Sequence, residues 1–264
     1  MNFKPKKIKE LFFLFGITII FFYSIYLGFT YSIYNQDYHH SFFILSPIID
    51  YKNEYKLFNE IFLQYGPGQT LFFNIISRFI EINIVSISQI TTLIYSLNLV
   101  LLFLIFKKIS SEIIAFCLVV TLFLIHPYSI YPWPDYLSGF CLSLFYYFFL
   151  QKNNSNFFLC SLFLFLAVFF RSTYLLNIFL AIIFFIIIFL FFKKKIFFKN
   201  IFNLFFLFIS TYFIILLYFD NLEIWFSQSI GLIGGYAQGT KHTELYLLIT
   251  SYLGENGFIF FKLI

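Results

Sequence analysis

The sequence predicts an all-α membrane protein, a polytopic bundle of about seven transmembrane helices. Of its 264 residues, 61% are hydrophobic and only 11% are charged, and the mean hydropathy is +0.89. Soluble domains carry about 25% charged residues, so this composition is not that of a soluble enzyme. The apolar runs are also long and continuous, as required of helices that cross ~30 Å of hydrocarbon.

The first expected span covers residues 11–30. Four lysines precede it in the N-terminal segment: Lys4, Lys6, Lys7 and Lys9. The apolar run is about 20 residues long, which exceeds the ~7–15-residue core of a signal peptide, and no small-residue cleavage site follows it. We therefore expect an uncleaved helix whose N-terminus lies in the cytoplasm.

A long polar loop, about residues 31–86, follows this first helix. Residues 41–49 are apolar, and residues 51–62 alternate charged and apolar side chains as an interfacial helix would. After a Gly66-Pro67-Gly68 turn, apolar residues recur at helical spacing and predict a helix along the membrane surface or partly inside it. These residues are Phe72, Ile75, Ile76, Phe79 and Ile80.

Further spans are expected beyond the loop. They cover residues 87–106, 112–130, 136–150, 157–172, 174–192 and 201–219. Most of the 17 lysine and arginine residues then fall on the side of the N-terminus, whereas every acid except Glu10 and Glu112 falls on the other side. Positively charged loops stay in the cytoplasm, so the loop 31–86 is expected to be extracytoplasmic. Because the lysines cluster at helix ends, the net charge of +5 does not predict nucleic-acid binding.

Asp37 follows the first span closely and is the candidate catalytic residue. A carboxylate there can act as general base toward an acceptor hydroxyl, or hold a cation. His39 and His40 are candidates for binding a phosphate or tuning Asp37. Asp37 and His40 are three residues apart, so a divalent cation between them stays open as an alternative. Without this context, Asp37 would be read as a solvated loop acid.

Further candidates for substrate binding lie on the same expected face. Tyr65 and Gly66 belong to a Tyr-Gly-Pro-Gly turn, whose backbone can cradle an anionic head group. Arg171 interrupts a phenylalanine-rich segment, where its charge must either snorkel to the interface or find an anion such as a lipid-linked phosphate. Asp135 is also a candidate, although its position after a proline favours an interfacial helix start over a catalytic acid.

Four short segments of the loop carry a family resemblance. They are Asp37-Tyr38-His39-His40, Pro47-Ile48-Ile49-Asp50-Tyr51, Leu57-Phe58-Asn59-Glu60-Ile61-Phe62 and Gln64-Tyr65-Gly66-Pro67-Gly68. In this order they resemble the first extracytoplasmic loop of bacterial GT-C-type glycosyltransferases, the multi-spanning relatives of protein mannosyltransferases and lipid A sugar transferases. The resemblance is strong over residues 10–80 and extends beyond them only as a general helix pattern. It departs from the family in lacking an acidic pair at Asp37, and the C-terminal part of the family fold is expected to be missing.

The resemblance implies an enzyme that moves a sugar from a polyprenyl-phosphate donor to a lipid or glycan acceptor of the cell envelope. The reaction is expected on the outer face of the bacterial inner membrane. In this family the acidic residue after the first helix is catalytic or lies near a metal, and Asp37 matches it. Two alternatives stay open. One is a non-catalytic flippase or transporter of lipid-linked saccharides, which predicts polar residues along several spans, and the other is an inactive truncated remnant.

Overall fold

The computed structural model describes most of the N-terminal two thirds of the chain. The described residues are 5–34, 38–58, 60, 61, 63, 65–125, 130–151 and 156–175, together with 178, 183, 205, 208 and 209. Their regular structure is helical, and no strand occurs among them. The elements are α1 (Pro5–Tyr31), the 3-10 helix η1 (Ser32–Tyr34), α2 (Tyr38–Lys52), α3 (Pro67–Ile76), α4 (Ile84–Ile109), α5 (Glu112–Ile125), α6 (Pro134–Phe149) and α7 (Asn156–Phe170).

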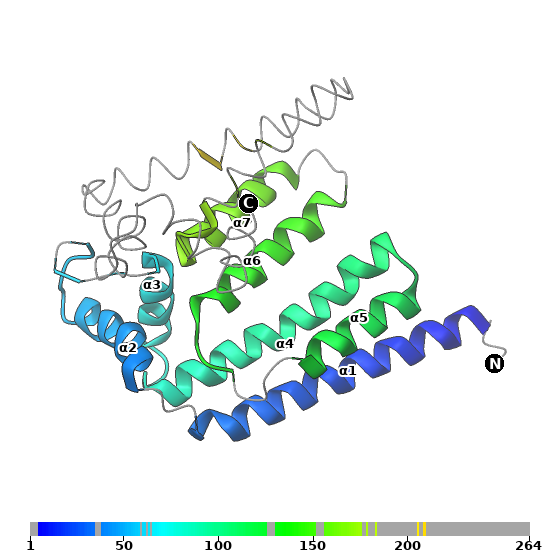
Figure 1. Cartoon of the computed structure of the whole chain (residues 1–264), viewed down its shortest axis with the longest axis horizontal. Coiled ribbons are helices and arrows are strands. Elements are labelled where there is room, and N and C mark those ends of the chain that lie inside the picture. The colour runs from blue at the N-terminus through cyan, green and yellow to red at the C-terminus, as the bar shows by residue number, and fades with distance from the viewer. Residues whose placement is uncertain are drawn as a thin grey trace, which may run out of the picture.

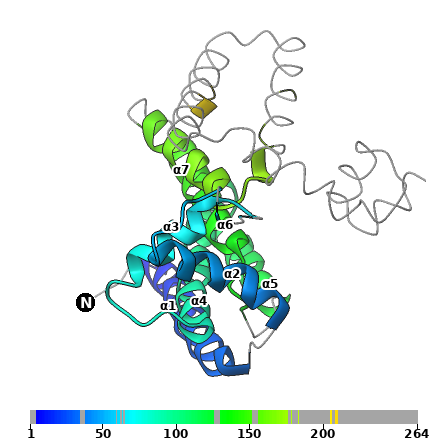
Figure 2. The same ribbon diagram turned by 90° about the vertical axis from the view of Figure 1, so that its left-hand side faces the viewer.

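Helices α1, α4, α5, α6 and α7 form a bundle in which neighbouring helices lie side by side (Figure 1). The start of α1, the turn between α4 and α5, the end of α6 and the start of α7 lie at one end of this bundle. Helices α2 and α3 lie at the opposite end, where α1 ends and α4 begins, as the view turned by 90° also shows (Figure 2). The lysine pattern predicts that the start of α1 and the α4–α5 turn lie on the cytoplasmic side of the membrane. These two places share one end of the bundle, as that prediction requires.

In the part of the chain that the structure describes, two helices are long and apolar enough to cross a membrane. One comprises the 25 residues Glu10–Tyr34, and the other is α4 with 26 residues. At a rise of about 1.5 Å per residue, each exceeds the ~30 Å thickness of the hydrocarbon layer. Helix α1 also exposes large aromatic side chains, among them Phe12, Phe15 and Phe22, as a surface in contact with lipid would. These features support membrane association.

The helices that match the next three expected spans are shorter. Helices α5, α6 and α7 contain 14, 16 and 15 residues, which corresponds to about 21–24 Å of helix. The expected spans at residues 174–192 and 201–219 lie almost entirely outside the described residues. The helical class of the fold is thus confirmed for the described part of the chain, whereas the count of seven spans remains a prediction.

Local sequence signals set the two ends of α4. At its start, the Asn83 side chain accepts the Ser86 N–H and the Asn83 N–H donates to the Ser86 hydroxyl, which together form a capping box. At its end, Lys107 and Lys108 stand at the negative pole of the helix dipole. Lys107 also pairs with Glu112 of α5 at 2.5 Å, so the α4–α5 turn carries complementary charges.

In the first half of the loop after α1, the helix lies at other residues than the sequence predicts. Helix α2 continues through Pro47 and ends at Lys52, so the interfacial helix expected over residues 51–62 is wrong. Glu54 and Phe58 have positive φ angles of 72° and 64°, which break a right-handed helix. The apolar side chains in this stretch are instead buried in one cluster together with residues of α7. They are Leu57, Phe58, Ile61 and Leu63.

The second half of the loop contains the expected helix α3, but only part of its expected apolar face packs against the protein. Phe73 is fully buried, whereas Ile75 on the expected apolar face is exposed. The helix ends at Ile76, so Phe79 and Ile80 follow it and are also exposed. Phe72 and Ile76 of the expected apolar face thus pack against the cluster around Phe73, whereas Ile75, Phe79 and Ile80 stay exposed, where lipid can cover them.

One apolar cluster joins α2 and α3 to the bundle. It contains Ile44 of α2, Phe73 of α3, Ile87 of α4, Leu137 of α6 and Ala167 of α7, all of them buried. Burial of a large apolar side chain contributes about 1.5–3 kcal/mol. The cluster therefore holds α3, the start of α6 and the end of α7 against one another.

Helices α1 and α4 approach each other closely at Gly28. A side-chain carbon at this position would lie 2.3 Å from Cγ2 and 2.5 Å from Oγ1 of Thr92. One turn earlier, Ser24 Oγ donates to Ser96 Oγ at 2.6 Å. We expect Gly28→Val to lower the free energy of unfolding by about 1–3 kcal/mol, because the added atoms force the two helices apart.

Thermal unfolding of the detergent-solubilised protein measures this effect. Adding Thr92→Ala to the Gly28→Val chain removes the two nearest atoms and should recover part of the loss. Gly139→Ala is the matched control, since a side-chain carbon there meets nothing within 4 Å. An equal loss in the Gly28 and Gly139 variants would contradict the close approach of α1 and α4.

Candidate functional site

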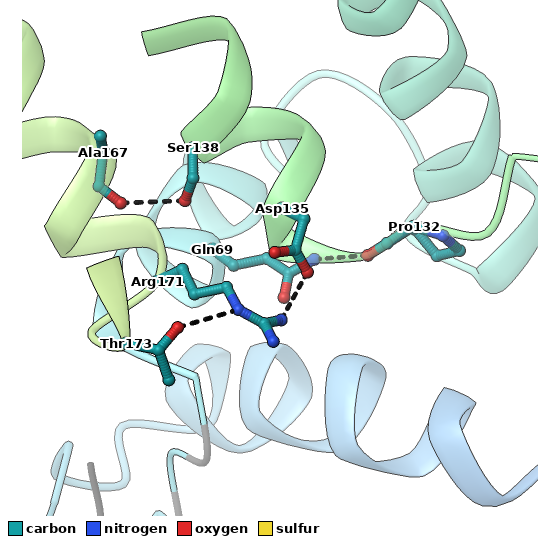
Figure 3. A network of polar contacts seen from close by, with 7 residues as sticks. All are labelled: Gln69, Pro132, Asp135, Ser138, Ala167, Arg171 and Thr173. Carbon is teal, nitrogen blue, oxygen red and sulfur yellow. Dashed lines mark hydrogen bonds and ion pairs between the residues drawn. The ribbon is translucent and has the colours of Figure 1, made fainter. Parts of the chain in front are cut away.

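Four of the candidate residues come together at the end of the bundle that carries α2 and α3. Tyr65 and Gly66 lead into α3, Asp135 lies in the first turn of α6, and Arg171 follows the last residue of α7. Figure 3 shows Asp135 and Arg171 facing each other, with Thr173 on the other side of the arginine. Residues far apart in the chain thus form one polar network.

Arg171 is the centre of this network. Its Nη1 donates to Oδ2 of Asp135 at 2.5 Å, and its Nε donates to Oγ1 of Thr173 at 3.1 Å. The ring centroid of Tyr65 lies 5.1 Å from the guanidinium carbon, within the range of cation–π attraction. The sequence suggested snorkelling or an external anion for Arg171. The structure instead provides an internal carboxylate, which neither interpretation included.

Asp135 occupies a position that favours its negative charge. Pro134 begins α6, and Asp135 follows in the first turn, where the helix dipole stabilises an anion. This confirms the predicted helix start. Burial nevertheless raises the pKa of the Asp135 carboxyl above its ordinary value, because the lowering effects of Arg171 and of a backbone hydrogen bond offset only part of the desolvation.

The turn before α3 packs against the C-terminal end of α7. The Ser172 N–H donates to the Tyr65 carbonyl oxygen at 2.7 Å. Gly66 has a φ of 143° and a ψ of 161°, a conformation essentially restricted to glycine. A side-chain carbon on Gly66 or on Gly68 would lie 2.7 Å from the carbonyl oxygen of Phe169. The predicted turn is present, and its glycines permit direct contact between two backbones.

We expect Gly66→Ala to lower the free energy of unfolding by about 1–3 kcal/mol, because alanine is strained at this φ and its methyl group meets a backbone carbonyl. Thermal unfolding in detergent, compared with Gly139→Ala, checks this expectation. If Gly66→Ala melted at the wild-type temperature, the contact between the turn and α7 would not exist as described.

Two buried hydrogen bonds at this end involve residues that the sequence did not single out. Gln69 Nε2 donates to the Pro132 carbonyl at 2.7 Å, and Ser138 Oγ donates to the Ala167 carbonyl at 2.9 Å (Figure 3). The first bond joins α3 to the segment before α6, and the second joins α6 to α7. The position of Gln69 directly after the Gly-Pro-Gly turn could have singled it out as a candidate. Its partner is a backbone carbonyl 63 residues away, which no sequence pattern identifies.

The other candidates are only partly described. Asp37 lies outside the described residues. His39 and His40 belong to the first turn of α2, but their side chains lie outside the described part. Where side chains are described, no group of three or more His, Cys, Asp and Glu residues could hold a metal ion. The roles of Asp37, His39 and His40, and the cation alternative, therefore stay predictions.

The described residues thus form a helical bundle with two helices long and apolar enough to cross a membrane, and an ionic network lies at one end of it. Comparison with protein-family models, with curated proteins and with solved structures finds no match. The relation to GT-C-type glycosyltransferases therefore rests on the sequence resemblance alone.

Proposed function

We propose that this protein is a membrane glycosyltransferase that moves a sugar from a polyprenyl-phosphate carrier to a lipid or glycan acceptor of the cell envelope. The reaction takes place on the extracytoplasmic face of the bacterial inner membrane. The observation that carries the proposal is the meeting of Tyr65, Asp135 and Arg171 at the end of the bundle where α2 begins, one residue after Asp37.

In the proposed reaction, an acceptor hydroxyl attacks the anomeric carbon of the donor sugar. A glycosidic C–O bond forms, the bond from the anomeric carbon to the phosphate oxygen breaks, and polyprenyl phosphate leaves with the bonding electrons. The Asp37 carboxylate takes the hydroxyl proton as general base. Arg171, His39 and His40 offset the charge of the phosphate. Because the leaving group is already a phosphate, positioning and electrostatic stabilisation supply much of the catalysis.

The transporter alternative receives no specific support from the described residues. It predicts polar side chains that line a path through several helices. Three buried hydroxyls of α4 are instead bonded within their own helix, since Thr91, Thr92 and Ser96 each donate to the carbonyl four residues earlier. Among the described residues, Ser88 Oγ and Asn98 Oδ1 of the same helix are buried without a hydrogen-bond partner. The three bonded hydroxyls therefore have local partners, and two isolated polar atoms on one helix do not line a path through several helices.

Incorporation of radiolabelled sugar in isolated membranes tests the proposal. Membranes that contain the protein are incubated with a panel of polyprenyl-phosphate sugars, beside membranes from the same host without it. The proposal predicts label in a lipid or glycan fraction only where the protein is present. Equal incorporation in both preparations across the panel would count against it.

A further inference from the structure

One edge of the Arg171 guanidinium group has no hydrogen-bond partner among the residues that the structure describes. The group carries five N–H donors. Nε bonds Thr173 and Nη1 bonds Asp135, and among the described residues no hydrogen bond or ion pair reaches Nη2. The pairing with Asp135 is thus a single-point contact and not the two-point fork that arginine and carboxylate can form. Figure 3 shows the unpaired end of the guanidinium pointing away from Asp135, toward the neighbouring helix α2.

The contacts of Arg171 fix the direction of this unpaired edge. Asp135 holds one nitrogen from α6, Thr173 holds another from the segment after α7, and the ring of Tyr65 lies beside the cation from the turn before α3. The Arg171 side chain as a whole is 24% exposed, so part of it is open to solvent. A charged donor held in advance by three separate segments binds an anion without the cost of ordering a long side chain.

We propose that the Nη2 edge of Arg171 binds a phosphate oxygen, and that Asp135 is a positioning residue that aims this edge at the ligand. The choice of a lipid-linked phosphate as the source rests on the proposed function. The anion approaches on the side of α2, the helix that begins directly after Asp37. Asp135 therefore acts through Arg171 and does not contact the substrate.

The native fluorescence of Trp133 offers a direct readout of binding. The ring of Trp133 lies edge-to-face with Tyr65, with centroids 5.7 Å apart, and Tyr65 contacts Arg171. The chain has two tryptophans, so Trp225→Phe leaves Trp133 as the reporter. This variant is reconstituted in nanodiscs of neutral lipid and titrated with farnesyl phosphate, farnesol or inorganic phosphate.

The expected result is a saturable change in Trp133 fluorescence with farnesyl phosphate and none with farnesol. A response to inorganic phosphate as well would assign the site to the phosphate group itself, and a response to farnesyl phosphate alone would assign it to a lipid phosphate. No response to either phosphate, or an equal response to farnesol, overturns the proposal. Arg171→Lys keeps the charge but loses the planar edge, and should weaken binding by about tenfold.

Variants of Asp135 separate positioning from general stability. Asp135→Asn keeps an oxygen that accepts from Nη1 and should bind farnesyl phosphate at least as tightly as wild type. Asp135→Ala frees the guanidinium and should weaken binding by about tenfold, through loss of preorganisation. Wild-type affinity in Asp135→Ala refutes the positioning role, and so does a loss in Asp135→Asn as large as that in Asp135→Ala. Since no sugar is present, a protein that binds farnesyl phosphate yet transfers no sugar would refute the proposed function and leave this inference intact.

Discussion

Asp37→Asn is expected to reduce sugar transfer by about 10²–10⁴-fold, the range that a positioned general base contributes. The substitution keeps the size of the side chain and removes its capacity to take a proton. Asp37 is chosen because it is the acid that directly follows the first helix and immediately precedes α2. The rate of transfer to a saturating acceptor, measured on equal amounts of folded protein, checks the expectation.

The matched control is Asp50→Asn in the same loop. Asp50 lies near the end of α2, where its Oδ2 accepts a hydrogen bond from Ser46 Oγ at 2.9 Å. An amide oxygen can accept the same bond, so transfer should stay within a few-fold of wild type. Equal rates in wild type and Asp37→Asn would remove Asp37 from the mechanism. A similar loss in both variants would attribute the effect to the general charge of the loop.

Arg171→Leu is expected to reduce transfer by about 10²–10³-fold, the cost of removing one charged donor from a developing anion. The same change leaves the Asp135 carboxylate without its cation and should lower the free energy of unfolding. Because the side chains of the pair are 24% and 43% exposed, solvent screens them, and a loss of about 1 kcal/mol is expected. Transfer rate and thermal unfolding are measured on the same preparations.

The double variant Arg171→Leu/Asp135→Leu separates the two consequences. It removes both charges and should regain most of the lost stability, since two apolar side chains can replace an ion pair at little cost. Transfer should stay low, because the guanidinium is still absent. If the double variant recovered transfer together with stability, the role of Arg171 would be structural only.

The long helices could be predicted from the sequence because apolar runs and their boundaries are local features. The span expected at residues 87–106 lies within α4, which extends it to Ile84 and Ile109. Its ends follow from the Asn83 cap and from Lys107 and Lys108. The start of α6 at Pro134 is likewise a local signal, as proline suits the first position of a helix.

The interior of the loop could not be predicted in the same way. Its apolar residues are placed by contacts with α7. These contacts join distant parts of the chain, so the spacing of residues within the loop does not predict them. The ion pair of Asp135 with Arg171 joins residues 36 positions apart, and the sequence marks each charge but not their pairing. The hydrogen bond from Gln69 to Pro132 is hidden for the same reason. Single candidate residues were therefore found, whereas the network that joins them required the structure.

The most direct test of the central claim is sugar transfer by the purified protein in proteoliposomes. Polyprenyl-phosphate sugars labelled in the sugar are added with an envelope lipid acceptor, and labelled product and free polyprenyl phosphate are both quantified. The account predicts that they form in equal amounts, at a rate that falls in Asp37→Asn. Folded protein that binds farnesyl phosphate but forms neither product with any donor would contradict it.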